Sequence, residues 1–118
     1  MFELMVEDTF DSAHALRGYQ GSCENLHGHT WRVQVFLSGE KLNDIGILHD
    51  FRDIRAQLRG IIDKYDHTNL NDLPEFQKIN PSSENIAKNI YETLKGGIRQ
   101  INKVTVWESA GTKASYYE

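Results

Sequence analysis

The chain has 118 residues, fewer than the ~150 typical of one domain, so we expect a single domain spanning residues 1–118. Its 13 Lys and Arg against 17 Asp and Glu give a formal net charge of −4, and the absence of a basic block argues against a protein that coats nucleic acid. A hydrophobic fraction of 39% with only two prolines excludes disordered and collagen-like chains.

The N-terminal residues and the cysteine content bear on the cellular compartment. No apolar run approaches the ~20 residues of a membrane-spanning helix, and Met1-Phe2-Glu3 lacks a basic start and a hydrophobic signal core. A single cysteine, Cys23, excludes an intrachain disulfide and is consistent with a reducing compartment. We therefore expect a cytoplasmic protein with neither a membrane nor a nucleic-acid partner.

Hydrophobic alternation predicts two strands in the N-terminal third. Apolar residues recur at even positions from residue 2 onward and put His14 on their face, so the first strand should end at His14. The run 29–37 alternates again and continues the face of His27 and His29. The turn-rich stretch between the two strands predicts a hairpin.

Two helical patterns follow. Apolar residues at three-to-four-residue spacing begin near Asp50 with Phe51 and run to Tyr65. The segment Pro81-Ser82-Ser83-Glu84 offers a serine cap for free backbone amides and a carboxylate at the positive helix end, and Gly96-Gly97 ends this second helix. The apolar stripe of each helix requires a sheet to cover it.

Two further strands complete the predicted fold. Val104 and Val106 alternate with Thr105 and Trp107, and Ala110-Gly111 turns the chain toward a short strand at residues 115–117. The order strand, strand, helix, helix, strand, strand predicts an α+β domain with an antiparallel four-stranded sheet and two helices on one face. The open edges of such a sheet favour pairing with further copies, so we expect a homo-oligomer.

Three histidines give the strongest indication of chemistry. His27 and His29 project from one face of an extended chain, and His14 can face them across the hairpin. Three imidazoles suit zinc, with the fourth position either open to water or substrate or closed by Cys23. The alternative is that these histidines only pack or hydrogen-bond at a strand edge.

Cys23 has two interpretations of its own. A lone cysteine is commonly a small apolar filler of the core. The polar turn around Cys23 favours a second role, because a thiol near a zinc ion and an imidazolium has a lowered pKa. The resulting thiolate can remove a proton from carbon or oxygen near neutral pH.

The remaining polar candidates are also open to two interpretations. Asp66 beside His67 either orients the imidazole or caps a turn. Glu108 ends an apolar strand face, where an unpaired carboxylate is costly. It pairs with a Lys or Arg, or it binds a ligand with two parallel N–H donors, such as the guanidine-like edge of a heterocycle. We expect His49 to be a surface or helix-start residue.

Six segments carry these residues in order along nearly the whole chain. They are Phe10-Asp11-Ser12-Ala13-His14, Cys23-x3-His27-Gly28-His29, Asp50-Phe51, Asp66-His67-x2-Leu70-Asn71, Asn80-Pro81-x2-Glu84 and Val106-Trp107-Glu108. Together they resemble the 6-pyruvoyl-tetrahydropterin synthase family. The resemblance implies the tunnelling fold, assembled into an oligomeric barrel, a tetramer or a hexamer, with active sites between subunits.

The resemblance also implies a role for each site residue. The zinc ligands would be His14, His27 and His29. Cys23 would remove a proton with help from His67, and Asp66 would orient His67. Glu108 would anchor the pterin through its amino-pyrimidinone edge and join the charge relay, approaching Cys23 of a neighbouring chain.

The spacing of three residues between Cys23 and His27 resembles the branch of the family that serves queuosine or other deazapurine biosynthesis. The implied reaction is that of a zinc-dependent carbon–carbon lyase, which converts 7,8-dihydroneopterin triphosphate to 6-carboxy-5,6,7,8-tetrahydropterin, acetaldehyde and triphosphate. Two alternatives stay open. One is the 6-pyruvoyl-tetrahydropterin synthase reaction, which removes triphosphate without cleaving the side chain, and the other is a zinc- or pterin-binding module without turnover. Lys113 and Arg17 are candidate contacts for the triphosphate.

Overall fold

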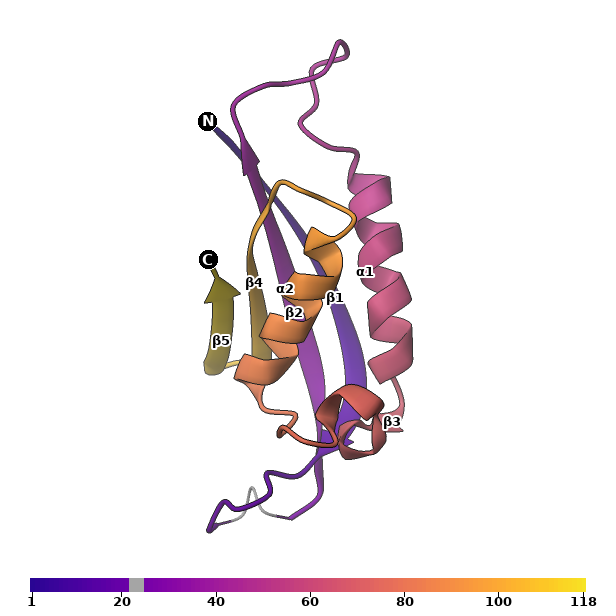
Figure 1. Ribbon diagram of the computed structural model, residues 1–118, viewed down its shortest axis with the longest axis vertical. Helices are drawn as coiled ribbons and strands as arrows, with labels where there is room; N and C mark the ends of the chain where they lie inside the picture. Colours follow the sequence, from indigo (N-terminus) through magenta and orange to yellow (C-terminus); the bar gives the residue numbers. More distant parts are fainter. Residues whose placement is uncertain (22–24) are drawn as a thin grey trace.

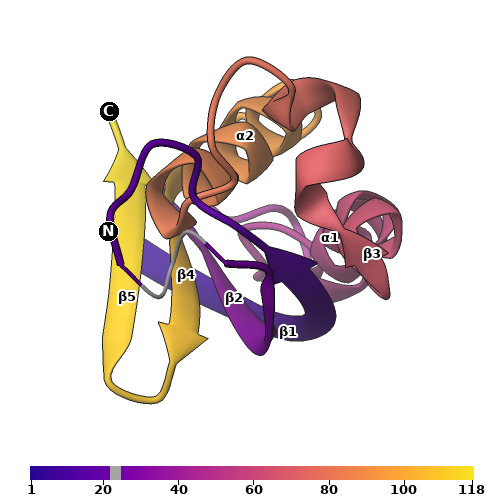
Figure 2. The same cartoon turned by 90° about the horizontal axis from the view of Figure 1, so that it is seen from below.

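The computed structural model describes residues 1–21 and 25–118, which form a five-stranded sheet with two α-helices on one face (Figure 1). The strands are β1 (Phe2–His14), β2 (His27–Gly39), β3 (Thr68–Asn69), β4 (Ile101–Ser109) and β5 (Thr112–Tyr117), and the helices are α1 (Phe51–Tyr65) and α2 (Ser83–Lys95). The strand order across the sheet is β3-β1-β2-β4-β5. The view from below shows both helices on the same side of the sheet (Figure 2).

The hairpin of β1 and β2 confirms the first two predicted strands. Its antiparallel register runs without a break from Phe2 opposite Gly39 to His14 opposite His27. The first strand ends at His14 as predicted, whereas the second begins at His27, two residues before the predicted run. The odd positions of β2 from Trp31 to Leu37 are fully buried, because alternation turns them toward the helices.

Both helices begin where the sequence predicts. The Asp50 carboxylate accepts a hydrogen bond from the Arg52 backbone N–H at 2.8 Å, and the Ser82 hydroxyl accepts one from the Asn85 N–H at 3.2 Å. These caps satisfy backbone donors that a helix start leaves free. The second helix ends before Gly96. Within residues 1–21 and 25–118, no helix is both long and apolar enough to cross a membrane.

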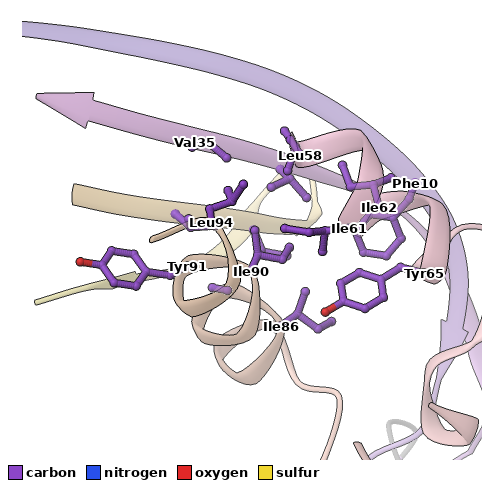
Figure 3. Close-up of a cluster of buried hydrophobic side chains, with 14 of the residues drawn as sticks. Phe10, Val35, Leu58, Ile61, Ile62, Tyr65, Ile86, Ile90, Tyr91 and Leu94 are labelled. Atoms are coloured by element: carbon purple, nitrogen blue, oxygen red, sulfur yellow. The ribbon is translucent and has the colours of Figure 1, made fainter. Parts of the chain in front are cut away.

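The core lies between the helices and the sheet (Figure 3). Leu58 and Ile62 of α1 and Ile86 and Ile90 of α2 are completely buried there. Burial on this scale supplies the main favourable free energy of folding. Phe51, by contrast, is 51% exposed although it begins the predicted apolar stripe.

The prediction of four antiparallel strands was wrong, because the sheet has a fifth strand that runs parallel to its neighbour. Strand β3 pairs with β1, with Ser12 opposite Thr68 and Ala13 opposite Asn69. Two residues are too short to show any alternation in sequence. The pairing arises because the chain leaves α1 alongside the outer edge of β1.

Candidate metal centre

The hairpin register brings three histidines together at one end of the sheet. His14 and His27 form the last pair of the ladder, and His29 lies two residues further along β2. The ring centroids lie 4.6 Å apart for His14 and His27, 5.3 Å for His14 and His29, and 4.7 Å for His27 and His29. The indole of Trp31 lies 4.8 Å from the His14 ring and 5.3 Å from the His29 ring. The three imidazoles thus form a cluster, two of whose rings pack against the Trp31 indole.

Backbone carbonyls orient two of the rings. His14 Nδ1 donates to the Pro81 carbonyl at 2.7 Å, and His27 Nδ1 donates to the Asn25 carbonyl at 2.7 Å. In neutral rings these bonds leave the lone pairs on Nε2, and the two Nε2 atoms are 3.1 Å apart. Two lone pairs at this distance repel unless a proton or a cation lies between them. Two nitrogens on one tetrahedral zinc lie about 3.3 Å apart, so the spacing fits zinc.

The third ring faces a carboxylate. His29 Nε2 lies 3.2 Å from Glu108 Oε1, but this buried nitrogen has no partner in hydrogen-bonding geometry among residues 1–21 and 25–118. The other oxygen, Glu108 Oε2, accepts a hydrogen bond from the Ser83 hydroxyl at 3.2 Å. His29 Nε2 is therefore available to a cation.

The four side chains form a set that could hold a metal ion. One donor atom from each of His14, His27, His29 and Glu108 lies within 4.8 Å of the others. Imidazole and carboxylate are both ordinary zinc ligands, and the carbonyl partners of His14 and His27 are the kind of outer contact that holds a ligating ring in place.

Burial prepares two of the imidazoles for metal binding. It lowers the pKa of both His14 and His29 below 6.5, although the Glu108 carboxylate opposes this shift in each case. The Pro81 carbonyl also opposes it at His14, while nearby His27 adds to it at both rings. Burial therefore favours the neutral form of both rings, which is the state that binds a metal.

Asp66 and His67 lie in a separate group with Asp11 rather than in the histidine cluster. Asp66 Oδ1 accepts from the Asp11 backbone N–H at 2.8 Å, while Asp66 Oδ2 lies 3.1 Å from His67 Nδ1 and 3.5 Å from the Arg59 guanidinium. The Asp11 amide, followed by His67 and Arg59, lowers the pKa of the Asp66 carboxyl. The two interpretations of this pair are thus compatible, because one carboxylate contacts the imidazole and also ties the turn to β1.

His67 itself occupies an unusual backbone conformation. Its φ is +57°, a region that non-glycine residues rarely adopt, and its side chain is 79% exposed. The His67 backbone N–H donates to the Asp11 carbonyl at 2.6 Å, which holds this turn against β1.

Of the other candidate residues, Glu108 and His49 each contact another side chain, and Cys23 is not among the residues described. Glu108 contacts His29 and Ser83, so its partners differ from the Lys or Arg that the sequence offered as one possibility. Cys23 lies outside the described residues. His49 pairs with Asp53 at the start of α1, as expected for a helix-start residue.

The two candidate triphosphate contacts are engaged elsewhere. Arg17 donates to the backbone carbonyls of Ile79 and Asn71 at 3.3 and 3.2 Å. Lys113 lies over the Trp107 ring, 5.2 Å from its centroid. By strand alternation Trp107 faces away from the side of the sheet that carries Glu108.

Sequence reasoning missed two contacts of the site. It assigned Pro81 and Ser83 only to the start of a helix, whereas Pro81 orients His14 and Ser83 binds Glu108. No local pattern reports such contacts, since they join residues that are 67 and 25 positions apart. The segment Asn80-Pro81-x2-Glu84 gave a signal for Pro81 but leaves Ser83 unspecified.

The family follows from comparison with known proteins. The family model described as 6-pyruvoyl tetrahydropterin synthase matches residues 3–118. The chain belongs to the 6-pyruvoyl tetrahydropterin synthase family. The resemblance drawn from the six segments is therefore confirmed, and with it the assignment to a family of pterin-synthesising enzymes.

Relatives within the 6-pyruvoyl tetrahydropterin synthase family carry different names. A 6-carboxy-5,6,7,8-tetrahydropterin synthase of Haemophilus influenzae is 30% identical over 141 residues, covering 100% of both chains. A dihydroneopterin monophosphate aldolase of Pyrococcus furiosus is 33% identical over 109 residues, covering 89% of this chain and 88% of the relative. The solved structure of Caenorhabditis elegans 6-pyruvoyl tetrahydropterin synthase superposes with a TM-score of 0.91 at 27% identity, covering 99% of this chain and 95% of that chain.

Proposed function

We propose that this protein is a zinc-dependent 6-carboxy-5,6,7,8-tetrahydropterin synthase that acts in queuosine or other deazapurine biosynthesis. The observation that carries the proposal is the convergence of three imidazoles, with His14 Nε2 and His27 Nε2 3.1 Å apart and His29 Nε2 buried beside Glu108. The Haemophilus influenzae relative of that name, matched over the full length of both chains, supports this choice of reaction.

The metal ligands in this proposal are His14, His27 and His29. The Pro81 and Asn25 carbonyls fix the tautomers of the first two, so that Nε2 faces the shared centre. Zinc bound there supplies a Lewis acid that makes substrate hydroxyl and adjacent C–H protons easier to remove.

Glu108 is proposed to anchor the pterin ring. Its side chain is 28% exposed, so an incoming ligand can reach the carboxylate. Two carboxylate oxygens match the paired N–H donors of an amino-pyrimidinone edge. When the pterin ring is held at Glu108, the side chain of the pterin lies beside the histidine cluster, because Glu108 and His29 are in contact. Such fixed placement matters since proton transfer requires hydrogen-bond reach.

Proton removal is assigned to Cys23 and His67 on the strength of the family resemblance. Asp66 contacts His67 Nδ1 at 3.1 Å, which supports its role in orienting that ring. The His67 side chain is largely exposed and belongs to a group separate from the histidine cluster. This arrangement supports a homo-oligomer in which His67 of one copy completes the active site of another.

Removal of a side-chain proton, loss of triphosphate and cleavage of the side chain, with one water molecule consumed, would then yield 6-carboxytetrahydropterin, acetaldehyde and triphosphate. The test is a product assay of the zinc-loaded protein with 7,8-dihydroneopterin triphosphate. We expect acetaldehyde and the carboxylated pterin in equal amounts. A pyruvoyl pterin without acetaldehyde would indicate the 6-pyruvoyl-tetrahydropterin synthase reaction instead.

Two further outcomes would contradict the proposal. Turnover of dihydroneopterin monophosphate but not of the triphosphate would match the name of the Pyrococcus furiosus relative. Binding of zinc and pterin without any product would indicate a non-catalytic binding module.

A further inference from the structure

The parallel pairing at the outer edge of β1 extends beyond the two residues of β3. Strand β3 lies opposite Ser12 and Ala13 with a constant offset of 56 residues. One step earlier at the same offset, the His67 backbone N–H donates to the Asp11 carbonyl at 2.6 Å. The ladder therefore begins at Asp11 and runs toward His14.

A side chain continues this ladder after the backbone has turned away. Asn71 Oδ1 accepts from the Ala15 backbone N–H at 2.8 Å, and Asn71 Nδ2 donates to the Ala15 carbonyl at 2.9 Å. The offset between these residues is again 56. The Asn71 amide thus satisfies both the N–H and the C=O of Ala15, as a directly opposed residue of an antiparallel strand would.

Asn80 repeats this contact two residues further along. Its Oδ1 accepts from the Arg17 backbone N–H at 2.9 Å, and its Nδ2 donates to the Arg17 carbonyl at 3.0 Å. The Asn80 carbonyl in turn accepts from Asn85 Nδ2 at 2.9 Å, which ties Asn80 to the first turn of α2. We call Asn71 and Asn80 the amide clamp.

The amide clamp holds the backbone that directly follows a proposed metal ligand. His14 is the last residue of β1, so its neighbours on the C-terminal side depend on the clamp for partners. The His14 ring donates to the carbonyl of Pro81, the residue after Asn80. Asn80 therefore fixes the position of this carbonyl relative to the backbone that carries the ring.

We propose that Asn71 and Asn80 are positioning residues for the metal centre. They keep His14 in register with the Pro81 carbonyl, and so keep His14 Nε2 directed at His27. This inference rests on the proposed function only in that the histidines bind zinc. It adds two residues that do not touch the metal but set its affinity.

The test compares leucine variants of the clamp with a matched asparagine elsewhere. Asn43 Oδ1 also accepts from two backbone N–H groups, those of Ile45 and Ile47 at 3.0 and 3.1 Å. It lies in the loop between β2 and α1, at the opposite end of the molecule (Figure 1). N43L thus removes two hydrogen bonds, as N71L and N80L do, but far from the histidines.

Zn²⁺ affinity is measured by competition with a chelating dye on folded protein. We expect N71L and N80L to weaken binding about 10-fold or more, as the loss of outer-shell contacts does, and N43L to leave it unchanged. In the metal-free proteins, hydrogen exchange at the Ala15 amide should accelerate in N71L, and exchange at the Arg17 amide in N80L. If N71L fails to fold, N71D serves in its place, since it keeps the acceptor for Ala15 and loses the donor.

Wild-type affinity in both clamp variants would overturn the inference, as would an equal loss in N43L. Failure of the wild-type protein to bind zinc at all would refute the proposed function first, before any variant is compared. The two failures are therefore distinguishable.

Discussion

The Glu108 carboxylate and the His29 imidazole lie side by side, with Oε1 3.2 Å from Nε2, on the neighbouring strands β4 and β2. This contact places the proposed pterin anchor against a proposed zinc ligand. A carboxylate in that position could bind either the pterin ring or the metal, and one substitution separates the two roles.

The variant Glu108→Gln keeps the shape of the side chain and removes its charge. We expect unchanged zinc stoichiometry and a loss of roughly 100-fold in kcat/KM, because the amide replaces one of the two acceptor oxygens with an NH2 donor that faces a ligand N–H. Metal analysis and steady-state kinetics measure the two quantities. A fall in the zinc content of the variant would make Glu108 a metal ligand instead.

Removal of one imidazole should abolish stoichiometric zinc. In His27→Ala the histidine set loses the ring whose Nε2 lies 3.1 Å from that of His14, and two protein ligands do not form a zinc site. Metal content after dialysis measures the effect. His49→Ala is the control, since His49 pairs with Asp53 away from the cluster. Full zinc occupancy in His27→Ala would contradict the ligand assignment.

Cys23→Ala separates chemistry from metal binding. We expect retained zinc and lost turnover, because the thiolate is the proposed proton acceptor while three histidines suffice to hold the metal. Product formation is followed with 7,8-dihydroneopterin triphosphate. Unchanged turnover would remove Cys23 from the mechanism, and loss of zinc would show that the thiol closes the coordination sphere.

Asp66 should make the stability of the protein depend on pH in the acid range. The pKa of its carboxyl is lowered below 3.8 in the fold, so the ionised form stabilises the folded state. This contribution is complete above the unfolded pKa and is lost as pH falls through the lower folded value. The free energy of unfolding of wild type minus that of Asp66→Asn, from urea titrations, should therefore shrink below pH 3.8. A difference that grows on acidification would contradict this assignment.

A core substitution tests the packing of α1 on the sheet. Leu58 is completely buried, and Leu58→Ala should cost roughly 2–5 kcal/mol in the free energy of unfolding. Leu42 is 41% exposed, so Leu42→Ala should change it by less than about 0.5 kcal/mol. Chemical denaturation of the two variants decides whether the buried stripe is correctly assigned.

The elements with a strong period were predictable from sequence. Alternation fixed the end of β1 at His14 and the shared face of His27 and His29, because in a strand with one buried face only one register puts the apolar side chains inside. The start of α1 near Asp50 and the serine cap of α2 were predictable because a cap is a hydrogen bond between residues close in sequence.

The remaining features depend on contacts between distant residues. Strand β3 has two residues and no alternation, so its pairing with Ser12 and Ala13 leaves no periodic trace. In the sequence Asn71 is typical of a turn, and its role becomes visible only in the fold, where its amide bonds to Ala15. The same holds for the Ser83 hydroxyl and Glu108, which meet only when α2 packs against β4.

Because the histidines lie on both strands of the long hairpin, metal binding depends on the register between β1 and β2. Thirteen residues of each strand are paired without interruption, and the histidines close the ladder at its far end. A slip of one residue would turn His14 outward while His27 stayed in place. Molecules in which β1 and β2 pair in the wrong register would then lose the cation to a competing chelator, and molecules with the native register would keep it.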